Sequence, residues 1–236
     1  MDKIDLMVLL REISLVKDAY LKAHQSGVAY YAGLIATKVC PAVHDLVFVA
    51  ALNHDVGKAF VTDEILFKPD KLTYEEWAKM KEHPVVGAQF FARENGCRLS
   101  REEKEVVRLA ILYHHERWDG KGYPEGLKGK DIPLEARIIA VADAYDAMTT
   151  DRPYRKALTG EEAAREILSH AGNQFDPRIA DVFAKLLEKK ENRRKKEESR
   201  EEKIIKKAAL EREVTEKRVC VNGKPISGKN CRVASQ

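Results

Sequence analysis

Helix start signals recur along this sequence, and no strand-like alternation of apolar and polar residues extends over its first 215 residues. Three stretches carry the Ser/Thr-x-x-Glu pattern of a capping box, in which two side chains satisfy amide groups at the start of a helix. They are Thr73-x-x-Glu76, Ser100-x-x-Glu103 and Thr159-x-x-Glu162. These boxes predict helices over about 74–94, 101–115 and 160–171. The sequence therefore predicts an all-α fold.

Apolar spacing and the placement of prolines predict the remaining helices. A proline ends a helix that precedes it and is well accommodated in the first turn of a helix that follows it. The expected helices cover 3–22, 24–39 before Pro41, 43–55 with Gly57 after it, Pro133 to about 149, and one that starts at Asp176-Pro177.

Charge is distributed unevenly and suggests three parts. Residues 188–218 hold 13 Lys/Arg against 9 Asp/Glu, and residues 1–187 hold 26 against 29, so the body is weakly acidic. A weakly acidic body is a poor surface for nucleic acid. The start of the chain fits neither a signal peptide nor a membrane span, so we expect a cytoplasmic protein with no membrane contact.

We expect a catalytic domain over 1–187, a charged helical arm over 188–218 and a tail over 219–236. The middle of the arm has no apolar face to bury, so a solvated helix is the simplest interpretation, with disorder and a short coiled coil as alternatives. Around Asn222-Gly223 the tail resembles a small hairpin. Cys220 and Cys231 make an incomplete metal site by themselves. We interpret the arm as a surface for self-association or for a protein partner.

Residues 114–124 join a histidine pair at an expected helix end to a loop punctuated by glycines. Two neighbouring imidazoles are a poor choice for a core, because their ring nitrogens need hydrogen bonds or a metal when they are buried. Glu116 and Asp119 are expected to fix the loop or the ligands through hydrogen bonds. The stretch reads His114-His115-Glu116-Arg117-Trp118-Asp119-Gly120-Lys121-Gly122-Tyr123-Pro124.

Further ligand-type residues lie upstream and downstream of this pair. His54 is followed at once by Asp55, and Asp143 lies in a nearly continuous apolar helix, where an unpaired carboxylate would be costly. Imidazole and carboxylate suit first-row transition metals such as iron, manganese and zinc. Adjacent helical residues project about 100° apart, so we expect His54/Asp55 and His114/His115 to serve neighbouring ions. His44 and His170 lie outside any motif and are expected to be surface or capping residues.

Several ordered motifs resemble those of the HD-GYP proteins, a bacterial branch of the HD-domain metal-dependent phosphohydrolases, over about residues 10–187. The resemblance implies a helical bundle around a non-haem metal centre that hydrolyses cyclic di-GMP to linear pGpG and, in some members, to GMP. The matching stretches are His54-Asp55-Val56-Gly57-Lys58, the isolated His83, all of His114 to Pro124, Asp143, Asp151-Arg152-Pro153-Tyr154-Arg155 and Gly172-Asn173-Gln174-Phe175-Asp176-Pro177.

The resemblance also implies roles for individual residues. Asp55 would bridge two divalent ions, iron or manganese, and Lys58 would face the scissile phosphate, where an ammonium offsets developing charge. Arg152 and Arg155 would hold the other phosphate. The loop of Gly120, Gly122, Tyr123 and Pro124 would lie beside the pocket and contact protein partners. The implied metal ligands are His24, His54, Asp55, His83, His114, His115 and Asp143.

Two positions depart from the family's pattern. Tyr20 stands where members with three metals carry a glutamate, and Gly27 stands where an arginine is usual. We therefore expect two ions rather than three. Besides cyclic di-GMP hydrolysis, the sequence leaves open an HD hydrolase of another cyclic dinucleotide or a nucleotide. It also leaves open a binding module that keeps the metal centre and signals through partners.

Overall fold

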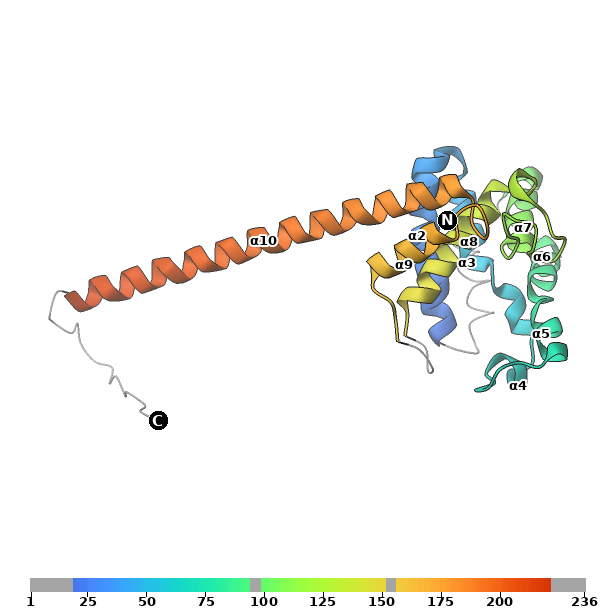
Figure 1. Ribbon diagram of the computed structural model, residues 1–236, viewed down its shortest axis with the longest axis horizontal. Helices are drawn as coiled ribbons and strands as arrows, with labels where there is room; N and C mark the ends of the chain where they lie inside the picture. The colour runs from blue at the N-terminus through green and yellow to red at the C-terminus, as the bar shows by residue number, and fades with distance from the viewer. Residues whose placement is uncertain (1–18, 94–98, 152–155, 222–236) are drawn as a thin grey trace. The chain divides into compact units, whose positions relative to one another are not determined.

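The computed structural model describes residues 19–93, 99–151 and 156–221 (Figure 1). Contacts within the chain divide it into two units, residues 1–188 and 189–236. The candidate site lies in the first unit, which is helical throughout its described residues apart from loops and one isolated bridge between Ala171 and Phe175. The all-α prediction is therefore confirmed for the described part of the chain.

Among the described residues of the first unit, six of the helices form a bundle in which neighbouring helices pack against one another. Helices α2, α3 and α8 contact one another, α7 contacts α3, α8 and α6, and α9 lies against α8 (Figure 1). Their bounds are α2 Ala19–Val39, α3 His44–Asn53, α6 His83–Arg93, α7 Arg101–Tyr113, α8 Leu134–Thr149 and α9 Gly160–Ser169. Shorter elements connect them, namely η2 Pro41–Val43, η3 Val56–Phe60, α4 Asp63–Leu66, α5 Tyr74–Met80 and η4 Gly129–Asp131.

Small apolar residues let the central helices approach closely. α2 buries Ala29, Ala32 and Ala36 completely, and α8 buries Ile138 and Ile139 in the same cluster. Close-packed side chains of this kind hold an interior rigid, because few voids remain for them to move into. The polar ends of α3, α6 and α7 are thereby held in fixed places around one point of the bundle.

The three predicted capping boxes are all present, and each has both of its reciprocal hydrogen bonds. The predicted helix over 74–94 is wrong in one respect, since a turn at Lys81 and Glu82 divides it into α5 and α6. Pro84 gives the physical reason. A proline has no amide hydrogen, so it cannot donate to the Met80 carbonyl as a continuous helix would require.

The last helix, α10, runs over Pro177–Val221. Its first turns bury Ile179, Ala180 and Phe183. The helix includes Val219–Val221, so the first residues of the expected hairpin are helical, and the rest of that hairpin lies outside the described residues. None of the described helices combines the length with the apolar character that a bilayer crossing needs.

Candidate metal centre

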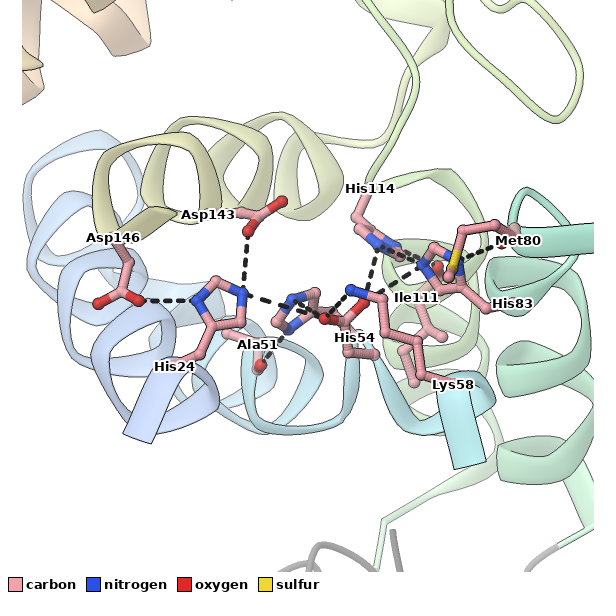
Figure 2. A network of polar contacts seen from close by, with 11 residues as sticks. His24, Ala51, His54, Lys58, Met80, His83, Ile111, His114, Asp143 and Asp146 are labelled. Atoms are coloured by element: carbon pink, nitrogen blue, oxygen red, sulfur yellow. Dashed lines mark hydrogen bonds and ion pairs between the residues drawn. The ribbon is translucent and has the colours of Figure 1, made fainter. Parts of the chain in front are cut away.

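The ends of three elements and the sides of two helices converge on one buried point. α2 contributes His24, the turn after α3 contributes His54 and Asp55, and α8 contributes Asp143. His83 is the first residue of α6, while His114 and His115 follow directly on α7. Figure 2 shows His24 and Asp143 at one side of His54 and shows His83 and His114 at the other.

These seven side chains form two groups of metal-ligand type. In each group the candidate ligand atoms all lie within 4.8 Å of one another. One group is Asp55, His83, His114 and His115, and the other is His24, His54 and Asp143. All seven residues named from the sequence are thus brought together by the fold.

The Asp55 carboxylate lies between the two groups and turns one oxygen toward each. Its Oδ1 is 3.2 Å from His83 Nε2 and 3.8 Å from His114 Nε2. Its Oδ2 is 3.4 Å from His54 Nε2 and 3.9 Å from His24 Nε2. With this placement, each oxygen of the Asp55 carboxylate could bind an ion on its own side.

Main-chain carbonyls fix the orientation of three of the imidazoles. The Nδ1 of His54 donates to the Ala51 carbonyl at 2.7 Å, and that of His114 donates to Ile111 at 2.7 Å. The Nδ1 of His83 donates at 2.8 Å to Met80, the carbonyl that Pro84 cannot use. A neutral imidazole that donates from Nδ1 keeps a lone pair on Nε2, which is the form that binds a metal.

The donor atoms fit a metal ion and are poorly satisfied without one. His83 Nε2 and His114 Nε2 lie 3.3 Å apart, and two nitrogens each about 2.1 Å from a tetrahedral or octahedral ion are roughly 3.0–3.4 Å apart. His54 Nε2 and Asp55 Oδ1 are buried without a hydrogen-bond partner. Because buried polar atoms are normally paired, these unpartnered atoms, one in each ligand group, indicate a cation in each group.

Burial and neighbouring charged groups shift the pKa values of the candidate ligands in opposite directions. Burial lowers the pKa of His115 to about 3 and that of His114 well below its usual range, so both rings are neutral and ready to bind at pH 7. Burial would also lower the pKa of His24, but hydrogen bonds to Asp143 and Asp146 raise it to about 10. Burial opposes ionisation of Asp55, yet Lys58 and the imidazoles hold its pKa below the usual range.

Lys58 lies at the edge of the centre on η3. Its Nζ donates to Asp55 Oδ2 at 2.6 Å, and its side chain is 23% exposed. The ammonium is therefore beside the Asp55 carboxylate and partly exposed. Its role toward the scissile phosphate stays a prediction.

The loop after His115 is closed by Glu116, which is buried. One carboxylate oxygen, Oε1, accepts the amides of Glu125 at 2.7 Å and Gly126 at 2.9 Å. A Cβ on Gly122 would lie 2.5 Å from the Glu116 Cα, so only glycine fits there. As a result the Tyr123 ring lies 4.9 Å from the His115 ring, beside the centre.

The same loop is tied to the stretch before α10. Arg117 donates to both carboxylate oxygens of Asp119, a pair that lowers the pKa of Asp119 to about 2. The amides of Trp118 and Asp119 donate to the carbonyls of Gln174 and Asn173. Two of the motifs recognised in the sequence therefore support one another.

Some predictions need correction or lie outside the described residues. We expected His114 and His115 to serve different ions, but they belong to one group, because α7 ends at Tyr113 and the two rings turn to the same side with centroids 4.1 Å apart. Arg152 and Arg155 lie outside the described residues, as does the side chain of Tyr20. His44 and His170 are partly exposed and lie in neither ligand group, as expected.

Sequence reasoning missed Asp146. This buried carboxylate of α8 accepts a hydrogen bond of 2.7 Å from His24 Nδ1. The signal that could have revealed it is its position three residues after Asp143, which places both carboxylates on one face of the helix.

Comparisons with known proteins agree with this geometry. The model of a family described as "HD domain" matches residues 8–179. A cyclic di-GMP phosphodiesterase of Thermotoga maritima is 38% identical over 185 residues, which cover 77% of this chain and 49% of that protein. The 3'3'-cGAMP-specific phosphodiesterase 2 of Vibrio cholerae is 35% identical over 194 residues, covering 77% of this chain and 36% of its own.

A solved structure shares the fold. It is Bd1817, an HDG"Y"P protein of Bdellovibrio bacteriovorus, with a TM-score of 0.55 and 24% identity over 71% of this chain and 52% of its own. The chain spans about half the length, or less, of the curated relatives that it matches. With the family match over most of its length and the paired ligand groups of its bundle, the chain belongs to the HD-domain family and carries the motifs of the HD-GYP branch.

Proposed function

We propose that this protein is a metal-dependent phosphodiesterase that hydrolyses cyclic di-GMP, with pGpG or GMP as the product. The observation that carries the proposal is the pair of neighbouring ligand groups, with Asp55 oxygens 3.2 Å from His83 of one group and 3.4 Å from His54 of the other. The relatives named cyclic di-GMP phosphodiesterase support the choice of substrate.

We assign the seven clustered residues as ligands of two divalent ions, and we choose iron or manganese because the resemblance to the HD-GYP proteins implies them and imidazole and carboxylate donors suit both. When bound, such a pair of ions lowers the pKa of water to supply a nucleophile and neutralises charge on the phosphoryl oxygens. His83, His114 and His115 hold one side of the centre with Asp55, and His24, His54 and Asp143 hold the other.

The chain's own residues then bind and orient the dinucleotide. We assign Lys58, which lies beside Asp55, to donate to a non-bridging oxygen of the scissile phosphate, where its charge would stabilise the transition state. We assign Arg152 and Arg155 to the second phosphate, a task that suits the forked donors of guanidinium. In each cleavage, water adds a hydroxyl to phosphorus and a proton to the departing 3′ oxygen.

A second substrate deserves testing because one relative is specific for 3'3'-cGAMP. Purified protein reconstituted with Mn²⁺ or with Fe²⁺ should be incubated separately with cyclic di-GMP and with 3'3'-cGAMP, and the products separated by chromatography. We expect pGpG or GMP from the first. Faster cleavage of 3'3'-cGAMP would identify the alternative hydrolase, and binding of both without cleavage would identify a signalling module.

Two variants separate metal binding from catalysis. Asp55→Ala should remove metal and activity together, because no water can replace a shared carboxylate at equal affinity. Lys58→Ala should keep both ions and lose activity by about 10²-fold or more, the scale for loss of one group that stabilises transition-state charge. Full occupancy of both sites in Asp55→Ala would show that the bridging assignment is wrong.

A further inference from the structure

His24 is held differently from three of the other ligand-type imidazoles. His54, His83 and His114 each donate from Nδ1 to a main-chain carbonyl, whereas His24 donates to the side chain of Asp146. We infer that Asp146 is a positioning residue for the ion of the His24 group, and that Gly27 makes room for it. The inference rests on the proposed metal centre and extends it to two residues outside the ligand set.

Two carboxylates of α8 contact the His24 ring, one at each ring nitrogen. Asp143 Oδ1 is 3.1 Å from Nε2, the nitrogen that faces the centre, and Asp146 Oδ2 is 2.7 Å from Nδ1 on the other side (Figure 2). The two carboxylates are three residues apart on one helix, so they project from the same face. The ring can therefore rotate only if one of these contacts breaks.

The Asp146 contact fixes which nitrogen of His24 faces the centre. A carboxylate only accepts when ionised, so the bond keeps a proton on Nδ1, and an ion would take the place of the second proton at Nε2. A carboxylate partner also raises the basicity of an imidazole ligand, and the loss of such a partner typically weakens metal affinity about 10–100-fold. Asp146 is only 7% exposed, which protects this bond from competition with water.

Gly27 lies one turn after His24 and is matched to the carboxylate. A Cβ built on Gly27 would be 1.8 Å from Asp146 Oδ1 and 2.7 Å from its Cγ. Any side chain at residue 27 therefore requires the carboxylate to leave its present position. This gives a way to disturb the bond without altering either of its partners.

The test compares three variants with two matched controls. Asp146→Ala removes the acceptor, Asp146→Asn keeps an acceptor but removes the charge, and Gly27→Ala displaces the intact carboxylate. Gly33→Ala is the control on the same helix, since its Cβ would come no closer than 3.3 Å to the end of the His44 ring. Asp181→Asn is the control for loss of a carboxylate, because Asp181 pairs with Lys185 on the surface.

Metal-free protein is dialysed against graded Mn²⁺, and the bound ions per chain are counted by elemental analysis, which gives one affinity for each site. We expect Asp146→Ala and Gly27→Ala to weaken one site about 10–100-fold and to leave the other within about twofold. Asp146→Asn should have a smaller effect of the same kind, and both controls should match the unaltered protein.

The inference is overturned if both sites keep their affinity in Asp146→Ala and Gly27→Ala. It is also overturned if both sites weaken equally together with a lower unfolding temperature of the metal-free variants, which is the pattern of general structural damage. The readout needs no nucleotide. An unaltered protein that binds two ions but cleaves no cyclic dinucleotide would refute the proposed function while still testing Asp146.

Discussion

Replacing Gly57 with alanine should separate two backbones whose contact holds the metal centre together. Gly57 is the second residue of η3, which begins directly after Asp55, and it packs against the first turns of α6. A Cβ on Gly57 would be 1.9 Å from the His83 carbonyl oxygen and 2.8 Å from the Gly87 nitrogen. Both atoms are main chain, so no side-chain rotation can relieve the overlap.

The size of the disturbance follows from these distances. Ordinary contacts of a Cβ begin at 3.4 Å, so η3 and α6 must move apart by about 1.5 Å. Asp55 travels with η3 and His83 with α6, and their ligand atoms are now 3.2 Å apart. A site tolerates only about 0.5 Å of such error. We expect the Asp55 and His83 group to lose metal affinity by at least 10²-fold.

The metal-free variant should also be less stable. Overpacking of a filled site costs about 1–3 kcal/mol, which for a domain of this size lowers the unfolding temperature by about 2–12 °C. Gly33→Ala is again the matched control and should be neutral or slightly stabilising, because alanine favours helix over glycine by about 1 kcal/mol. The assays are ion counts after dialysis and thermal unfolding. A Gly57→Ala protein that behaves like Gly33→Ala in both would refute this reasoning.

Three further predictions concern other parts of the chain. Arg152→Ala and Arg155→Ala should each raise the KM for cyclic di-GMP by about 10–100-fold without changing the number of bound ions, because each variant loses a charge-assisted hydrogen bond. Unchanged kinetics in both variants would reject the assignment of these arginines to the second phosphate. A chain that ends at Lys190 should keep its ions and most of its activity while the number of chains per assembly, measured by light scattering, falls. We propose that the exposed arm, with Ile204 and Ile205 each 67% exposed, mediates self-association or partner docking. Loss of metal or an unchanged number of chains per assembly would contradict this. The metal-free protein should lose stability as pH falls from 6.5 toward 3. In the unfolded chain His114 and His115 take up protons near pH 6.5, whereas in the folded chain burial lowers the pKa of His115 to about 3 and that of His114 well below its usual range. A free energy of unfolding, measured by urea titration, that increases as pH falls from 7 to 5 would contradict this prediction.

Local signals allowed much of the fold to be predicted. Capping boxes depend on residues only three apart, so Thr73, Ser100 and Thr159 marked their helix starts correctly. The division of α5 from α6 was missed because the apolar pattern continues through it, although Pro84 was a sign of the break. The ligand set could be named because its members sit in recognisable motifs.

What the sequence did not reveal depends on distances across the bundle. The partnership of Asp146 with His24 spans residues far apart in the chain, and the spacing of Asp146 from Asp143 indicates a shared helix face without identifying His24 as the partner. We read Gly57 as a helix breaker, yet α3 already ends at Asn53, and the glycine is needed for the approach of α6. The grouping of His114 with His115 also depended on where α7 stops, which a helical projection cannot tell.

The main-chain acceptors of three imidazoles have a consequence for how this centre withstands point mutations. Ala51, Met80 and Ile111 each offer a carbonyl that any amino acid in the same backbone would offer. Exchanges at these three positions can therefore alter packing while the tautomers of His54, His83 and His114 stay fixed. His24 depends on a side-chain acceptor instead, and one nucleotide change in the codon of Asp146 is enough to remove it. We therefore expect random substitutions to weaken metal binding on the His24 side of the centre before they weaken it on the other side.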